Sequence, residues 1–241
     1  MSILVVTGTG TGVGKTTTTA ALAALAAARG ASVAVVKPAQ TGVANFESGD
    51  LTEIARLAGI TDTHEYARYP DPLSPAAAAR LSGLPPLSLA DAAADIRKLA
   101  DSRRLVLVEG AGGLLVRFDE EGATLADLAR DLGAPVLIVA DPALGTLNHT
   151  ALTLESMAMR GVELAGVVLG SWPMEPDEPD LAMRCNIRDL ETLSARPLAG
   201  AVPARAGELD APEFLLAART ALSPQFGGTF DAAVFRAHYG R

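Results

Sequence analysis

Continuous apolar stretches alternate with longer segments rich in alanine and leucine along most of the chain. Continuous apolar positions are typical of strands that are buried on both faces of a sheet. We expect strands at Ile3–Thr7, Val33–Lys37, Leu105–Glu109, Val136–Ala140, Leu164–Leu169 and Leu198–Val202. The segments between them predict helices at Lys15–Arg29, Asp50–Leu57, Leu89–Ala100, Leu125–Asp131, Leu147–Arg160 and Leu181–Leu193. This alternation predicts an α/β fold with a mostly parallel sheet and helices on both faces.

Two stretches interrupt the pattern and indicate surface loops. Residues Trp172–Asp180 are rich in proline and acidic residues, and Ser223–Thr229 contain one proline and two glycines. Apolar positions after Thr229 have helical spacing, so residues 223–241 predict a C-terminal loop followed by a docked helix. Thr124, with Asp127 three residues later, predicts a helix N-cap.

Composition narrows the class of protein. A length of 241 residues and 49% hydrophobic residues predict one globular domain, residues 1–241. A net charge of -8 argues against a protein that binds the nucleic-acid backbone, and no apolar stretch approaches the ~20 residues that span a bilayer. A single cysteine, Cys185, excludes an internal disulfide and suits a reducing compartment. We therefore expect a cytoplasmic protein with neither nucleic acid nor membrane as partner.

A glycine-rich segment, GTGTGVGKTT, joins the first expected strand to the first expected helix at Gly8–Thr17. Such a turn aims backbone N–H groups at phosphate oxygens, and the helix N-terminus adds positive potential. Lys15 would reach the β- and γ-phosphates, and the Thr16 hydroxyl would bind Mg²⁺. The spacing is G-x5-G-K-T, one residue longer than the usual phosphate loop. The residues expected to hold the phosphates are Gly12, Val13, Gly14, Lys15, Thr16 and Thr17.

Charged residues at the ends of other expected strands are candidates for the same site. Glu109 ends one strand and is followed by Gly110, Ala111 and Gly112, while Asp50 begins a helix after a loop. Ligands gather at the carboxyl ends of strands in open α/β sheets, so both carboxylates are candidate metal ligands and nucleotide contacts. Lys37 ends the second expected strand. It would bring a second cation to the crevice of Lys15, where charge moves during phosphoryl transfer.

The ordered set of motifs resembles the dethiobiotin synthetase family, which has a P-loop NTPase fold. The segments that carry the resemblance are Gly8–Thr16, Lys37-Pro38-x-x-Thr41-Gly42, Asp50, Val108–Gly113 and Gly145–His149. The resemblance implies an ATP-dependent ligase that closes a cyclic urea on 7,8-diaminononanoate with CO₂, in biotin synthesis. It also implies Mg²⁺ on Thr16, Asp50 and Glu109, with Lys37 and Lys15 as catalytic lysines.

The resemblance further implies where the diamine and the nucleotide base bind. Thr11 and Thr41 would contact the diamine. A loop of a neighbouring subunit would hold its carboxylate tail, which implies a homodimer with the site at the interface; the loop residues are Leu144, Gly145, Thr146, Leu147 and Asn148. Alternatively, Asn148 caps its own helix. The base would lie against Gly170, Ser171, Pro203, Ala204 and Arg205.

One departure from the family concerns the base. The family often has an Asn-Asp pair where this chain has Gly170 and Ser171. Because buried polar groups provide discrimination, their absence predicts weak base selectivity, with CTP or other triphosphates accepted beside ATP. The following Trp172 could stack on the base or be structural.

Two alternatives share the P-loop. A deviant-Walker ATPase switch of the partitioning or scaffold type would have a signature lysine near the start of the loop, where this chain has Gly10. A C-terminal amphipathic basic helix is also missing from the sequence pattern. An amidoligase of cobalamin synthesis would need a glutaminase domain, for which 241 residues leave no room.

Overall fold

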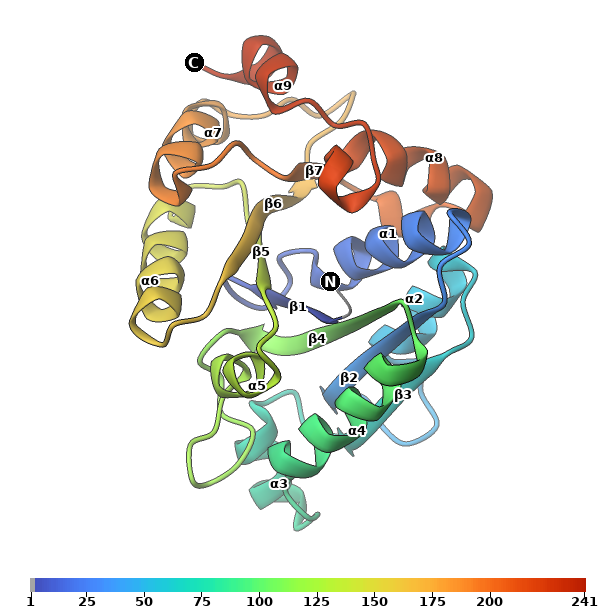
Figure 1. Ribbon diagram of the computed structural model, residues 1–241. Coiled ribbons are helices and arrows are strands. Elements are labelled where there is room, and N and C mark those ends of the chain that lie inside the picture. The colour runs from blue at the N-terminus through green and yellow to red at the C-terminus, as the bar shows by residue number, and fades with distance from the viewer. Residues whose placement is uncertain (1–2) are drawn as a thin grey trace.

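The computed structural model describes residues 3–241, so residues 1–2 of the predicted domain lie outside the described part. Seven strands form one sheet in the order β3-β2-β4-β1-β5-β6-β7, and every neighbouring pair is parallel. The predicted α/β class with a mostly parallel sheet is confirmed (Figure 1). The strands are β1 (Ile3–Gly8), β2 (Val33–Thr41), β3 (Thr63–Tyr69), β4 (Leu105–Gly113), β5 (Val136–Ala140), β6 (Leu164–Trp172) and β7 (Gly200–Pro203).

Helices cover both faces of the sheet (Figure 1). One face packs against α1 (Lys15–Ala28), α2 (Asp50–Ala58) and α8 (Ala211–Ala221). The other face packs against α3 (Pro75–Ser82), α4 (Leu89–Ser102), α5 (Leu125–Leu132), α6 (Thr146–Met159), α7 (Leu181–Ser194) and α9 (Ala232–Tyr239). Two short 3₁₀ turns lie at Ala206–Glu208 and Pro224–Phe226.

Helix α1 is buried along most of its length because it lies between the sheet and two other helices, α2 and α8. Its small alanine side chains allow this close packing on several sides, which explains the run from Ala20 to Ala24. Two buried threonines of the helix satisfy their hydroxyls locally, since Thr18 donates to Gly14 O and Thr19 donates to Lys15 O. The start of α1 is therefore held firmly beneath the phosphate loop.

Three elements were not predicted. Strand β3 mixes polar and apolar residues without regular alternation. It is an edge strand of the sheet, and its side chains are mostly half-buried. Helix α3 follows Ser74 with a proline at its first position, and α8 follows Asp210, whose carboxylate caps it through Glu213 N–H. Both helices have the usual start signals, but the helix prediction relied on longer segments rich in alanine and leucine.

Several strands extend beyond their predicted ends. Lys37 and Glu109 were expected at strand ends, but β2 continues to Thr41 and β4 to Gly113. The pairing of β2 with β4 stops at Val36 and Val108, after which β2 continues only along β3. The crevice therefore opens where neighbouring strands separate, one residue before Lys37 and Glu109.

The prediction of Trp172 as a loop residue is wrong. Trp172 is the last residue of β6, lies opposite Pro203 of β7, and is 2% exposed. The predicted helix cap at Thr124 is confirmed, because the Asp127 carboxylate accepts from both the Thr124 N–H and its hydroxyl.

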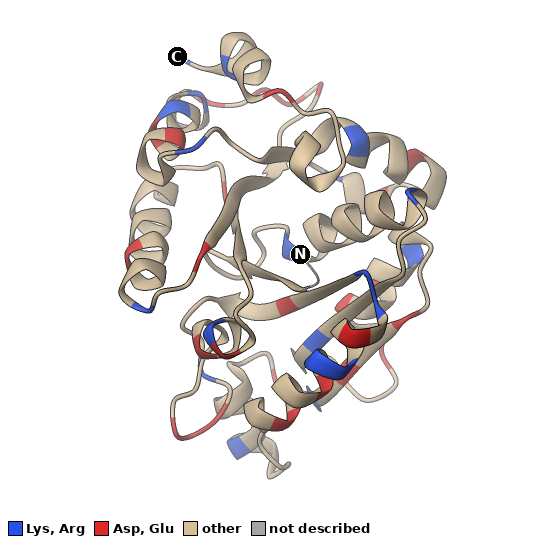
Figure 2. Ribbon diagram, in the orientation of Figure 1, with Lys and Arg blue, Asp and Glu red and all other residues tan. Residues whose placement is uncertain are grey.

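Lysines and arginines are interspersed with acidic residues over the ribbon (Figure 2). In the described part of the chain, every helix is too short or too polar to cross a bilayer.

Candidate active site

The phosphate loop lies between the end of β1 and the start of α1. Its last glycine, Gly14, has φ +93 and forms the N-cap of α1. A side chain there would be strained by this left-handed conformation, and its Cβ would lie 2.2 Å from Gly170 O in β6. Only glycine fits this position, so the loop can begin the helix while packing against β6.

Lys15 folds back over the loop that precedes it. Its ammonium donates to Gly10 O at 2.8 Å, and the residue is only 7% exposed. Burial, and after it the nearby positive charge of Lys37, lower the pKa of Lys15 to about 8. The two ammonium groups are thus close enough to interact electrostatically.

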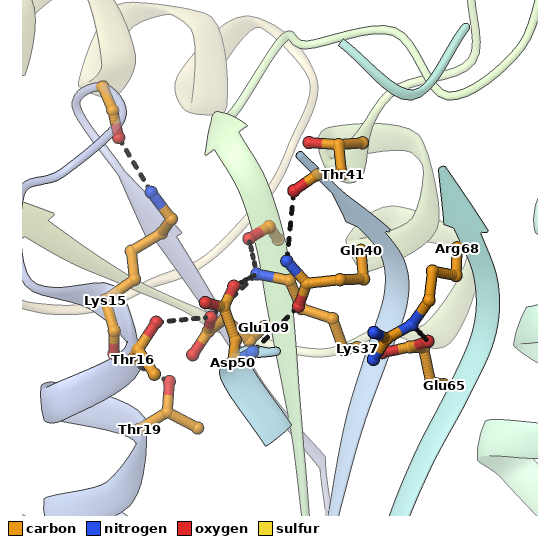
Figure 3. A network of polar contacts seen from close by, with 12 residues as sticks. Lys15, Thr16, Thr19, Lys37, Gln40, Thr41, Asp50, Glu65, Arg68 and Glu109 are labelled. Atoms are coloured by element: carbon orange, nitrogen blue, oxygen red, sulfur yellow. Dashed lines mark hydrogen bonds and ion pairs between the residues drawn. The ribbon is translucent and has the colours of Figure 1, made fainter. Parts of the chain in front are cut away.

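Lys37 lies between two carboxylates (Figure 3). Its ammonium nitrogen is 2.5 Å from Asp50 Oδ2 and 2.8 Å from Glu109 Oε1. Lys37 is 3% exposed and Glu109 is fully buried. Burial alone would lower the pKa of Lys37, but the charges and hydrogen bonds of Glu109 and Asp50 raise it above its ordinary value. Lys37 therefore stays protonated.

The donor set fits a magnesium ion. The Thr16 hydroxyl lies 3.1 Å from Glu109 Oε1, and Glu109 Oε2 is buried without a hydrogen-bond partner. Mg²⁺ is commonly bound by one or two carboxylates together with phosphates and waters. The described residues contain no group of three or more His, Cys, Asp or Glu arranged for a metal. A site made of Thr16, Asp50 and Glu109 would therefore need the nucleotide phosphates to complete its coordination.

Asp50 is held in place by a residue that the sequence analysis missed. The buried side chain of Gln40 in β2 accepts from Asp50 N–H at 2.9 Å through Oε1 (Figure 3). The N-cap residue of α2 is Gly49, which has no side chain to cap the helix, so Gln40 takes this role from the neighbouring strand. One indication of this role was present in the sequence, since Gln40 lies within the segment from Lys37 to Gly42 that carries the family resemblance.

The loop before Asp50 is fixed by an ion pair of β3. The Arg68 guanidinium binds Glu65 through two nitrogens, at 2.6 and 2.9 Å, and also donates to the carbonyl oxygens of Ala44 and Glu47. Because β3 was not predicted, this support for the site could not be predicted either.

A cavity of about 800 Å³ lies above the phosphate loop. Its lining includes ten predicted site residues: Thr11, Gly12, Gly14, Lys15, Thr16, Lys37, Thr41, Asp50, Ala111 and Gly112. A further wall, not predicted, is formed by Val43, Val116 and the segment 72–75, which leads into the first residue of α3. The cavity thus has a charged floor and a largely apolar side.

The segment 144–148 lies outside this cavity. Leu144 is 87% exposed in the turn between β5 and α6. The alternative in which Asn148 caps its own helix is wrong, because the N-cap of α6 is Gly145 and Asn148 lies exposed within the first turn. The strand-end residue Asp141 accepts from Ala143 N–H and so stabilises the turn.

Of the segments predicted for the base, Gly170–Ser171 lies beside the phosphate loop. Gly170 packs so tightly that a Cβ there would lie 1.8 Å from Val13 O. Next to it, Ser171 is exposed. Across from β6, Pro203 ends β7, and Arg205 follows it, with its guanidinium paired to Glu208. The possibility that Trp172 stacks on the base is wrong in this structure, because its ring is buried against α9.

The fold is shared with solved structures of two ATPases. The cell division ATPase MinD of Pyrococcus furiosus matches with a TM-score of 0.53 and 20% identity, covering 90% of each chain. A ParA family ATPase of Chlorobium tepidum matches with a TM-score of 0.55 and 14% identity, covering 98% of this chain and 99% of that chain. At these identities the likeness establishes the P-loop fold alone.

Sequence comparison identifies the family to which the chain belongs. A family described as an AAA domain matches residues 2–212. The ATP-dependent dethiobiotin synthetases BioD of Parafrankia sp. and Frankia casuarinae are 63% and 65% identical to this chain over 239 residues, covering 99% of each chain. That of Streptomyces coelicolor is 55% identical and covers 100% of both. The chain therefore belongs to the ATP-dependent dethiobiotin synthetase family.

Proposed function

We propose that this chain is an ATP-dependent dethiobiotin synthetase, a cyclo-ligase of biotin synthesis. It joins CO₂ to 7,8-diaminononanoate and releases ADP and phosphate. The observation that carries the proposal is the buried Lys37 ammonium, which comes from β2 yet lines the same cavity as Lys15 of the phosphate loop. Two buried cations that line one cavity suit a reaction in which negative charge moves from a phosphate to a second substrate.

The proposed reaction has three steps. One amine of the diamine attacks CO₂, forms a carbon–nitrogen bond and loses a proton, which leaves a carbamate. A carbamate oxygen then takes the γ-phosphoryl group as its bond to ADP breaks, giving a carbamic-phosphoric anhydride. The second amine attacks the carbonyl carbon, loses a proton and closes the ureido ring as phosphate leaves. Lys15 and Lys37 would stabilise the anionic groups in each step, and the cavity would align the reactants.

Thr16, Asp50 and Glu109 would hold Mg²⁺ beside the nucleotide. When bound, the ion neutralises charge on the β- and γ-phosphates. The unpartnered Glu109 Oε2 and the Thr16 hydroxyl next to it support this assignment. Gly12, Val13, Gly14 and Thr17 would surround the phosphates, with Gly110, Ala111 and Gly112 on the opposite side. Thr11 and Thr41, which both line the cavity, would contact the diamine.

We further propose a homodimer in which residues 144–148 of one copy complete the site of the other. The support is an apolar row on the outer face of α6 and its preceding turn, where Leu144, Leu152 and Met159 are 87%, 57% and 82% exposed. The first N–H groups of α6 would then bind the carboxylate tail of the diamine. A Leu152→Arg variant should sediment as a monomer and bind the diamine weakly. A fully active monomer would contradict this arrangement.

The base pocket is proposed between Gly170–Ser171 and Pro203–Arg205. Neither segment offers the buried side-chain amide that the family often uses to read adenine. We therefore expect CTP, GTP and UTP to replace ATP at subsaturating concentrations. A preference for ATP of about a hundredfold or more over all three would contradict weak selectivity, since a difference of that size needs specific polar contacts. The cytoplasmic location stays a prediction.

The proposal is tested by phosphate release from purified protein with diaminononanoate, bicarbonate, Mg²⁺ and ATP. Release should depend on the diamine and yield dethiobiotin, which mass spectrometry would identify. Release that is independent of the diamine would instead favour an ATPase switch. The likeness to MinD and ParA supports only the shared fold. Such switches need a lysine side chain at the position of Gly10, which here provides only a backbone carbonyl that accepts from Lys15.

A further inference from the structure

The C-terminal helix α9 packs its aromatic side against the end of β6. Trp172 makes edge-to-face contacts with Phe235 and Tyr239, with ring centroids 4.9 and 5.3 Å apart. Phe230 extends the cluster through Phe235, at 5.1 Å. Aromatic residues make up only 4% of the chain, so gathering them at one place is a specific use of a scarce residue type. Each such pair stabilises its geometry beyond simple burial.

The main chain at Trp172 joins two segments that line the proposed base pocket. Its carbonyl oxygen accepts from Ala204 N–H at 2.7 Å, which ties the end of β6 to the turn after β7. Two residues earlier, Gly170 lies against the phosphate loop without room for a Cβ. The position of Trp172 therefore sets the spacing between Gly170–Ser171 on one side and Ala204–Arg205 on the other.

Helix α9 holds Trp172 from the margin of the core, where its apolar side chains are only partly buried. No residue of the helix itself is fully buried, whereas Ile187 and Leu190 of α7, which belong to the same hydrophobic cluster as Trp172, are. Phe235 and Tyr239 are four residues apart, so they lie on one side of the helix, while Val234 is 65% exposed. Asp231 caps the helix through Ala233 N–H and Val234 N–H.

We propose that α9 is a positioning element for the nucleotide base. It holds Trp172, and through the Trp172 main chain it fixes the two walls that contact the base. This inference rests on the proposed function only in placing the base between those walls. Phe235 and Tyr239 are positioning residues, because they act through Trp172 and contact neither the nucleotide nor the diamine. The predicted consequence is that α9 controls binding of the nucleoside part of the substrate but leaves the triphosphate part unaffected.

The test compares nucleotides with tripolyphosphate, which has the phosphates without a base. In a Phe235→Ala/Tyr239→Ala variant, the dissociation constants of ATP and CTP with Mg²⁺ should rise about tenfold, the equivalent of losing two aromatic pairs. Binding of tripolyphosphate should stay unchanged in calorimetry. The KM for the diamine should also stay unchanged.

The chain provides its own optical signal and its own controls. Trp172 is the single tryptophan, so a red shift of its emission reports directly that α9 has released it. Val234→Ser, on the exposed side of the same helix, should leave emission and affinity unchanged. Tyr239→Phe keeps the ring and should retain affinity. If the double variant unfolds, the milder Phe235→Leu should show a smaller red shift and a smaller loss of nucleotide affinity, again without a change in tripolyphosphate binding.

Two results would overturn the inference. One is unchanged nucleotide affinity in a variant whose emission shows an exposed Trp172. The other is an equal loss for ATP and tripolyphosphate, which would indicate general loosening of the phosphate loop. Because binding is measured directly, both outcomes are independent of the ligase assay. Failure of the diamine to promote phosphate release would reject the proposed function and leave the binding test standing.

Discussion

The two ends of the proposed nucleotide site are built in different ways. At the phosphate end, charged side chains are buried and held by one another, with Lys37 between Asp50 and Glu109. At the base end, the walls are main chain, held by the Trp172–Ala204 hydrogen bond and an aromatic cluster behind it. The difference indicates that the phosphate end depends on the chemistry of particular side chains, whereas the base end depends on packing at a distance.

The largest expected effect tests the phosphate end. Lys37→Met should lower kcat about 10²–10³-fold, the usual loss when one preorganised electrostatic partner of a transition state is removed. Nucleotide binding should persist, because the phosphate loop is intact. Steady-state rates and calorimetry measure the two effects. Lys98→Met, at an exposed ion pair on α4, is the control. A normal rate for Lys37→Met would remove this lysine from the mechanism.

Loss of stability must be separated from loss of catalysis in that variant. Removing one partner of a buried ion pair typically costs about 3–5 kcal/mol, because the other charge stays buried. Thermal unfolding should therefore shift downward for Lys37→Met. Assays below the new transition keep the catalytic comparison valid.

The next effect tests the place where the two ends meet. Gly170→Ala would put a Cβ 1.8 Å from Val13 O and 2.5 Å from a Val139 methyl carbon. Such overpacking costs about 1–3 kcal/mol, and here it would displace the phosphate loop. Both ATP and tripolyphosphate should bind more weakly, unlike the α9 variants. In Gly10→Ala the nearest contact of the Cβ is 3.9 Å, so this control should be nearly neutral. Equal binding by Gly170→Ala and the wild type would show that the two ends are independent.

A smaller effect is expected from Gln40, which supports the phosphate end indirectly. Gln40→Leu removes the cap of α2 at Asp50, worth about 1 kcal/mol, so the Mg²⁺ concentration for half-maximal rate should rise about fivefold. Gln40→Glu keeps an acceptor and should restore much of the function. Gln225→Leu removes another glutamine hydrogen bond, donated by Nε2 to Ala165 O of β6, and serves as the control. An unchanged Mg²⁺ requirement would show that Asp50 needs no such support.

The smallest effect should come from a change away from both ends. Asp127→Ala removes the capping interaction with Thr124 and should cost about 1 kcal/mol of unfolding free energy. Nucleotide affinity and base preference should not change. Denaturant unfolding and calorimetry measure these quantities. A change in base preference would mean that the base end responds to any loss of stability, which would weaken the role proposed for α9.

The same contrast explains what the sequence could predict. Gly12, Lys15 and Thr16 lie within one contiguous motif, and a lysine or carboxylate next to a buried strand is visible without coordinates. The structure brings Lys37, Asp50 and Glu109 together as expected. The parallel sheet was equally accessible, because its central strands are continuous apolar runs.

The missed features depend on contacts between distant segments. Strand β3 has the mixed pattern of an edge strand, so Arg68 and Glu65 gave no sign of supporting the loop before Asp50. Trp172 precedes a proline and an acidic stretch, which suggested a loop, yet β7 and α9 pack around it. Gln40 gains its role only because α2 begins beside it. Pairing of remote elements, and not local pattern, determines each of these positions.

The ion pairs of the site also determine which form of the nucleotide it would select. The two lysines and the two carboxylates around the cavity, Lys15, Lys37, Asp50 and Glu109, have formal charges that cancel at neutral pH. A pocket with no net charge gives little long-range attraction to a free triphosphate carrying four negative charges. A nucleotide that arrives with its own divalent cation brings half that charge and a partner for each carboxylate. Charge balance therefore predicts that the site selects the metal complex over the bare nucleotide, even in a protein whose overall charge is -8.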